Sequence, residues 1–281
     1  MHIPRTWARA AANGLTPDGR QIPVSIWGWG DDESGARKEA ANRLARMLER
    51  IARGEPLPGR YAYGSRPLRE EILQTFESEA SGPPSAMLTR NGYGAQVLNT
   101  AALLFLDVDL PERTRFRRWL NTIGLSRDDA ENTTLTKLRD ALQRYGRATF
   151  RLYRTASGFR AIAIDRQFEP TGREAQELMH VTGTDPAFVR LCSVQRSFRA
   201  RLTPKPWRCG TPVAPGEHPR EDAESRQRFA AWLAEYDRAS SGYATSRYLE
   251  TIGTGRLAAF GGKLIDLHDR ATRCDESLPL A

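Results

Sequence analysis

Leu103-Leu104-Phe105-Leu106-Asp107-Val108-Asp109-Leu110 is the stretch of this 281-residue chain that decides its fold. Its apolar first half predicts a strand in a protein core. Two acids then stand one residue apart. Because side chains alternate between the faces of a strand, Asp107 and Asp109 share one face, with their Cα atoms roughly 7 Å apart. Two carboxylates on one face repel each other unless a cation, an arginine or a hydrogen-bond network compensates them.

Two interpretations of this acid pair are open. In the first, Asp107 and Asp109 are catalytic residues that hold a divalent cation, Mg²⁺ or Mn²⁺, together with phosphates. In the second, Asp109 only ends the strand before Pro111, and Asp107 pairs with one of the many arginines. The residues that follow the strand have to distinguish them.

The elements after the acid pair predict an α+β fold. Their order is strand, helix, strand, strand, helix, strand, which is the split βαβ plan of ferredoxin-like and RRM-like proteins, an antiparallel sheet with helices on one face. In this plan the first and third strands are central neighbours, so we expect Asp107 and Arg160 to approach each other. The predicted elements are a strand at 103–110, helical stretches up to Tyr145, strands at 148–154 and 159–164, a helix at 170–180 and a strand at 197–203.

The segments on either side of this core complete a prediction of three regions. Residues 1–94 form an N-terminal α+β region that packs on the core, residues 95–210 form the core, and residues 211–281 form a C-terminal helix and an irregular tail. In the first region, Thr16-Pro17-Asp18-Gly19 predicts a hairpin turn, and the apolar stripe from Ala36 to Ile51 predicts a helix. We also expect an acidic helix around residues 69–76 and, in the third region, a helix over residues 221–238.

A second candidate site is the turn that joins the two middle strands of the core, Thr155-Ala156-Ser157-Gly158-Phe159-Arg160. Gly158 would let the backbone come close to a ligand, and Ser157 offers a hydroxyl beside free amides. Arg160 could then bind a phosphate through two hydrogen bonds. The alternative is an ordinary turn in which the arginine balances a buried aspartate.

A third candidate site is basic. In the last strand of the core, Arg199 and Arg201 share one face and apolar residues take the other. A row of arginines with an aromatic side chain nearby suits a phosphate backbone or a stacked base. The alternative is a structural network in which the arginines pair with acids of the sheet. The candidate nucleic-acid-binding residues are Arg199, Arg201, Lys205, Trp207 and Arg208.

Taken together, an Asp-x-Asp at the end of the first strand and a Ser-Gly-x-basic hairpin resemble the catalytic half of archaeo-eukaryotic primases and primase-polymerases. The resemblance covers residues 95–205 and implies a palm-like core. It implies that Asp107 and Asp109 bind metal and that Ser157, with Arg160, contacts the phosphates of a nucleotide. Arg160 stands where the family has a histidine. The last strand lacks the family's third acid, for which Asp165 and Asp185 are substitutes.

Composition limits the classes of protein and partner. The net charge is +8, from 42 Lys and Arg against 34 Asp and Glu, which favours polyanionic partners such as a nucleotide or nucleic acid. A GC-rich coding bias toward arginine is an alternative explanation. The chain has no apolar run long enough for a membrane span and no pattern of a secretory signal. Three cysteines without zinc-ligand spacing point to a reducing compartment, so we expect a cytoplasmic protein.

These observations leave two classes of function. The first is an enzyme, a metal-dependent protein for nucleotidyl or phosphoryl transfer that resembles a primase. The second is not an enzyme: a nucleic-acid-binding module on the same fold, or an inactive relative that serves as a partner protein. The missing histidine and third acid favour the second class, whereas the acid pair favours the first, which is the function that we expect from the sequence.

Overall fold

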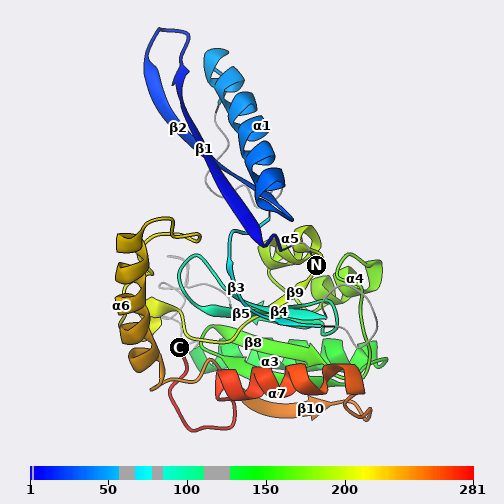
Figure 1. The fold of residues 1–281 in the computed structure, drawn as a ribbon. Helices are drawn as coiled ribbons and strands as arrows, with labels where there is room; N and C mark the ends of the chain where they lie inside the picture. The colour runs from blue at the N-terminus through cyan, green and yellow to red at the C-terminus, as the bar shows by residue number, and fades with distance from the viewer. Residues whose placement is uncertain (2, 57–66, 78–84, 111–126) are drawn as a thin grey trace, which may run out of the picture. The chain divides into compact units, whose positions relative to one another are not determined.

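A computed structural model of the chain describes all residues except residue 2 and residues 57–66, 78–84 and 111–126 (Figure 1). It divides into two compact units. One unit is residues 2–70, and the other is residues 71–281 with Met1. The predicted boundary at 94/95 falls inside the second unit.

The smaller unit is a β-hairpin with one helix. Strand β1 (Thr6–Leu15) pairs antiparallel with β2 (Gln21–Gly30), and α1 (Glu33–Ala52) follows. The Asp32 side chain caps α1 by accepting a hydrogen bond from the amide of Gly35, which satisfies one of the free donors of the first turn. Gly28 lies so close to α1 that a Cβ atom there would be 2.0 Å from the backbone nitrogen of Ala40. The predicted hairpin and helix are therefore confirmed.

The larger unit contains two antiparallel sheets of four strands each. The first sheet has the order β10-β7-β8-β6. Its strands β6, β8 and β7 correspond to the first, third and second strands of the predicted core and lie in the expected order. Their bounds are Phe105–Asp109 (β6), Phe150–Thr155 (β7), Gly158–Ala163 (β8) and Ser246–Ile252 (β10).

The second sheet has the order β3-β4-β5-β9. Here the structure corrects two predictions. The last predicted core strand, β9, pairs with β5 and not with the sheet of β6, because Val97–Thr100 offers it a strand edge of matching length. The segment expected to be an acidic helix is strand β3. The bounds are Glu71–Phe76 (β3), Ala86–Arg90 (β4), Gln96–Thr100 (β5) and Phe198–Arg201 (β9).

Helices cover both faces of the first sheet. On one face, Arg154 of β7 pairs with Glu131 of α3 (Arg127–Tyr145). On the other face, α7 (Gly262–Thr272) packs on β6 and β7 through His268, whose ring lies 6.1 Å from that of Phe105 and 4.9 Å from that of Tyr153. The remaining helices are α4 (Arg173–Val181), α5 (Pro186–Gln195) and α6 (Ala223–Ser240), with short 3-10 helices η2 (Pro206–Arg208) and η3 (Ala259–Gly261).

The C-terminal region is ordered into sheet and helix, so the predicted irregular tail is wrong. Strand β10 adds to the edge of β7, and α7 buries Leu264, Ile265 and His268 at helical spacing. Helix α7 thereby covers a face of the sheet that the split βαβ plan leaves without helices. The predicted α+β class is confirmed, and side chains from both sheets join one hydrophobic core.

Candidate functional site: a buried ion pair beside a basic segment

The acid pair lies where the sequence places it, on one face of β6. The pairing of β6 with β8 sets Asp107 opposite Arg160 and Asp109 opposite Gly158. Arg160 donates from Nε to Oδ1 of Asp107 at 2.7 Å and from Nη2 to Oδ2 at 2.9 Å. The predicted approach of Asp107 and Arg160 is thus confirmed as a bidentate ion pair, which is the strong geometry for an arginine and a carboxylate.

The hydrogen-bond donors of Arg160 are largely used within the protein. Its side chain is 3% exposed. Its Nη1 donates to the backbone carbonyl of Arg201 at 3.0 Å and lies 3.4 Å from Nε2 of His268. Its predicted role as a phosphate contact requires donors that face solvent, whereas burial and these protein acceptors make it the counter-ion of Asp107.

A polar network extends from Arg160 into α7. If Nε2 of His268 accepts from Arg160, Nδ1 carries the proton and donates to Oδ1 of Asp269, 2.9 Å away. Burial lowers the pKa of His268, and the Arg160 charge lowers it further, which favours this neutral form of the ring. Although burial raises the pKa of Asp269, hydrogen bonds from His268 and Tyr153 and the charge of Arg151 bring it below its usual range.

Sequence reasoning missed this network. Tyr153 donates to Asp269 at 2.8 Å, and Arg151 donates to Asp269 and to the Tyr153 hydroxyl, both at 2.7 Å. The available signals were the alternation of Arg151 and Tyr153 in a strand and the adjacent His268-Asp269 pair within an apolar helical stripe. The network is internally satisfied, and its Tyr153 and His268 are fully buried, so it supports the sheet rather than a ligand.

Asp109, Ser157 and Gly158 lie together at the end of the β6–β8 pair. Asp109 is exposed and accepts a hydrogen bond of 3.2 Å from the Ser157 hydroxyl. Gly158 was expected to admit a ligand, but the space is taken by β6: a Cβ atom there would lie 2.0 Å from the carbonyl oxygen of Val108. Gly158 is therefore explained by strand packing.

The donor set does not fit a resident Mg²⁺ or Mn²⁺ ion. Both oxygens of Asp107 accept from a guanidinium, whose positive charge opposes a second cation at the same carboxylate. Of the substitutes for a third acid, Asp165 accepts from the amide of Thr149 and Asp185 caps α5. Within the described residues, no group of three or more His, Cys, Asp or Glu side chains is placed to hold a metal ion.

Of the basic candidates, Arg199 lies in the interior. It is 6% exposed and donates to the side-chain carbonyl of Asn99, its partner residue across β5 and β9. Asn99 is itself fully buried and donates to backbone carbonyls of β4 and β5. The prediction that Arg199 contacts nucleic acid is therefore wrong: the residue belongs to a polar contact inside the sheet.

The other three cations form what we call the 201–208 segment: the end of β9, the loop after it and η2. Burial and the charges of Arg160 and Arg208 lower the pKa of Arg201. Burial and the charges of Arg201 and Arg208 lower the pKa of Lys205, against a smaller opposite effect of Asp109. Arg208 is thus close enough to disfavour the charges of both Arg201 and Lys205, and Arg201 is close enough to disfavour that of Lys205.

These three cations also lack ion-pair partners within the described part of the chain. Among the described residues, no carboxylate lies within ion-pair distance of Arg201, Lys205 or Arg208. Nη1 of Arg208 is buried and has no hydrogen-bond partner among the described residues. Unpartnered buried donors are rare in folded proteins and call for an explanation. A positive patch this close to Asp109 that the protein does not neutralise is suited to an anion.

An exposed tryptophan stands within the same segment. Trp207 is 53% exposed, with its ring centroid 5.3 Å from that of Tyr93 in an edge-to-face arrangement. Nζ of Lys205 lies 5.6 Å from the Trp207 ring centroid. Tyr93 comes from the turn between β4 and β5, which the sequence pattern did not assign to a site.

Helix α6 holds both parts of this site in place. The Tyr236 hydroxyl lies 2.7 Å from Oγ1 of Thr203 and 2.7 Å from the carbonyl of Pro204, at the start of the loop that carries Lys205 and Trp207. Trp232 packs against the β4–β5 turn so closely that a Cβ atom on Gly94 would lie 2.1 Å from its ring. Gly94 also has φ of +100°, which favours glycine. Rigid support of this kind suits a binding surface.

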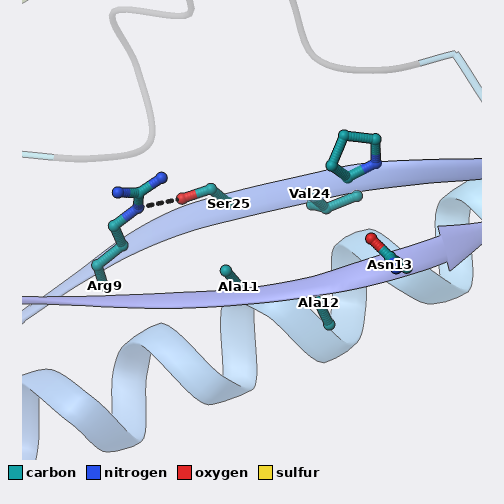
Figure 2. A pocket seen from close by; sticks show the side chains of 7 residues that line it. Arg9, Ala11, Ala12, Asn13, Val24 and Ser25 are labelled. Atoms are coloured by element: carbon teal, nitrogen blue, oxygen red, sulfur yellow. Dashed lines mark hydrogen bonds between the residues drawn. The ribbon is translucent and has the colours of Figure 1, made fainter.

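The smaller unit has an open cavity of about 510 Å³ on its hairpin (Figure 2). Small side chains line most of it, among them Ala11 of β1 and Val24 of β2. Its one charged residue, Arg9, bonds to Ser25. Because the described residues that line it include no acid, histidine or cysteine, they offer no acid–base or metal chemistry.

Comparisons with protein-family models, with curated proteins and with solved structures found no match to this chain. In the described part of the chain, no helix has both the length and the apolar character needed to cross a membrane. Function therefore has to be argued from the residues of the candidate site.

Proposed function

We propose that this protein is a nucleic-acid-binding module whose 201–208 segment binds the phosphate backbone. The observation that carries the proposal is the set of three neighbouring cations without carboxylate partners among the described residues. Several arginines of the same unit do have such partners, as Arg160 has Asp107 and Arg154 has Glu131. Cations that repel each other are stabilised when an anion binds between them, and phosphate is the anion that arginine forks suit best.

The net charge of the chain supports the same ligand class. A surplus of eight positive charges raises the local concentration of polyanions and speeds their association. Charge alone does not select a site, whereas the proximity of Arg201, Lys205 and Arg208 to one another, without carboxylate partners among the described residues, does. Binding through this segment needs neither the Asp107–Arg160 pair to open nor a metal ion.

The test is the salt dependence of binding. Fluorescence anisotropy with a labelled oligothymidine would be measured from about 50 to 200 mM salt for the wild type and for the double variant Lys205→Gln, Arg208→Gln. Removal of one phosphate-binding cation should reduce the slope of log K against log salt by about 0.7 on a single strand, so we expect the double variant to reduce it by about 1.4. Thermal melts would verify that the double variant folds.

A matched control removes two charges elsewhere on the same unit. Arg173 and Arg228 are exposed residues of α4 and α6 that pair with Glu177 and Glu224 one helical turn away. The variant Arg173→Gln, Arg228→Gln has the same net charge as the site variant. An equal reduction of slope in both variants would show that binding depends on net charge alone. That result would overturn the proposed site.

A second candidate function, metal-dependent nucleotidyl or phosphoryl transfer, is favoured by one observation. Asp109 is exposed, shares the β6 face with Asp107 and lies near enough to Lys205 to affect its pKa. We rank it second because Arg160 occupies both oxygens of Asp107. It predicts that Mn²⁺ and a nucleotide bind together and that Asp109→Asn removes both.

A further inference from the structure

The aromatic residues beside the cations define the class of nucleic acid. We infer that Trp207 stacks an unpaired base, so that the ligand of the 201–208 segment is single-stranded; this rests on the proposed function. In a duplex the faces of the bases are covered by their neighbours, and only backbone and groove edges are accessible. A protein that presents an aromatic ring next to backbone-binding cations therefore prefers strands whose bases can leave the stack.

The exposure of Trp207 is the first argument. A large aromatic side chain is normally buried, because it contributes most to stability when it is removed from water. Trp207 instead keeps 53% of its surface exposed. The proline on its N-terminal side, Pro206, is buried, and the loop is closed by hydrogen bonds from Arg208 to Lys205 and from Cys209 to Pro206. The ring is thus exposed on a backbone that is itself fixed.

The surroundings of the ring are the second argument. Tyr93 meets Trp207 edge-to-face at 5.3 Å, which limits how far the indole can rotate. Lys205 lies over the ring at 5.6 Å and is also one of the three cations of the 201–208 segment. A base on the exposed indole surface would therefore place its own phosphate next to Lys205 and Arg208. Adjacent contacts for a base and its phosphate are what recognition of a single strand requires.

The geometry also makes this site independent of the Asp107–Arg160 ion pair. Lys205 and Arg208 can hold the phosphate while Asp107 stays paired with Arg160. The expected ligand is thus an unmodified single strand, bound without turnover. Base identity should matter little, because a π-face is common to all bases.

The experiment compares two ligands that differ only in their bases. One is an oligothymidine of about 12 nucleotides, within the usual site sizes of single-strand-binding folds, and the other is an abasic strand of equal length and charge. With full-length wild-type protein, we expect the oligothymidine to bind roughly 5- to 150-fold more tightly, the equivalent of about 1–3 kcal/mol for one stacked base. A duplex of the same length should bind no more tightly than the abasic strand.

Variants at Trp207 identify the stacking residue. Trp207→Ala should lower oligothymidine affinity to that of the abasic strand and leave abasic binding unchanged. Trp207→Phe should retain most of the preference but lose the ligand-induced quenching of tryptophan fluorescence that we expect for the wild type. Val213→Ala, at another exposed apolar residue of the neighbouring loop, is the matched control and should change neither affinity.

The outcomes separate the two proposals. Equal, salt-dependent binding of both strands by the wild type would overturn the stacking inference and leave the cation site standing. Binding of neither strand would overturn the proposed function itself. A preference for bases that survives Trp207→Ala would show that another aromatic residue stacks the base, which also overturns the inference.

Discussion

Arginine has opposite roles at two neighbouring places in the larger unit. In the sheet of β6, β7 and β8, Arg160 is buried and gives its donors to Asp107, a backbone carbonyl and His268. In the 201–208 segment, Arg208 has a buried nitrogen without a hydrogen-bond partner in the described residues. The difference lies in the counter-ions: Arg160 is neutralised by Asp107 when the chain folds, whereas Arg208 has no carboxylate partner among the described residues, and for this reason we propose that it binds an anion.

This comparison shows how to interpret basic residues in a sheet. A guanidinium whose donors are all used contributes to folding and has nothing to offer a ligand. A guanidinium without partners contributes little to folding and is available for binding. Exposure alone does not separate the cases, because Arg151 and Arg208 are both part-buried, although Arg151 pairs with Asp269 and Arg208 has no carboxylate partner among the described residues. The acceptors that the protein itself supplies do separate them.

The largest effect that we expect is on stability, from Arg160→Ala. Loss of one partner of a buried ion pair costs about 3–5 kcal/mol, because the other charge is left without compensation. Asp107 is 32% exposed, so water can compensate part of its charge, and we expect a loss of about 3 kcal/mol in the free energy of unfolding. Chemical denaturation measures it.

Two further variants sharpen that result. Arg160→Ala, Asp107→Ala should be more stable than Arg160→Ala alone, because no charge is stranded. Arg208→Gln should change stability by less than about 1 kcal/mol, since no ion pair is broken. If Arg160→Ala and Arg208→Gln lower the free energy of unfolding equally, the two arginines do not differ in their contribution to folding, and the comparison is wrong.

A smaller effect concerns acid. The pKa of His268 is lowered in the folded protein, so between its folded value and its unfolded value of about 6.5 the unfolded chain binds more protons. The stability due to the neutral ring is therefore complete above about pH 6.5 and is lost as the pH falls below it. Melting temperatures from pH 8 to about 5 should decline in the wild type.

His268→Gln tests the source of this decline. A glutamine can accept from Arg160 and donate to Asp269 without titrating, so the variant should melt with a flatter pH dependence. The lowered pKa of Asp269 acts in the same direction only at more acidic pH, where its stabilisation is lost as the carboxylate is protonated. An unchanged slope in the variant would exclude His268 as the group responsible.

Local sequence patterns predicted the parts of the fold that local physics determines. The turn at Thr16–Gly19 and the apolar stripe of α1 were enough for the hairpin and helix of the smaller unit. The order of β6, β8 and β7 also followed from the pattern, and with it the contact of Asp107 with Arg160. A pattern of alternating or helical spacing is decided by neighbouring residues, so it can be recognised in the sequence.

Pairing between distant segments could not be predicted in the same way. The alternation in β9 identifies a strand but not its partner, and β5, which pairs with it, is a short segment about 100 residues earlier. Arg199 was assigned to a surface for this reason, although its partner Asn99 lies in β5. Likewise α7 buries His268 against a sheet that begins at residue 105, a contact that no local pattern specifies.

The smallest effect that we expect is that of a divalent metal ion on nucleic-acid binding. In the function that we propose, the 201–208 segment binds phosphates through its own cations, and the carboxylate of Asp107 is already held by Arg160. Oligothymidine affinity at fixed ionic strength should therefore change less than about twofold between Mn²⁺ and EDTA, well under the 1.4 kcal/mol of a tenfold effect. Asp109→Asn should leave the ratio of the affinities in Mn²⁺ and EDTA unchanged. Because it removes a negative charge near Lys205, it should strengthen binding slightly under both conditions.

A tenfold gain in affinity with Mn²⁺ that Asp109→Asn abolishes would contradict this expectation. The acid pair would then bind metal when the nucleic acid is present, and the transfer enzyme would replace the binding module as the better account of β6.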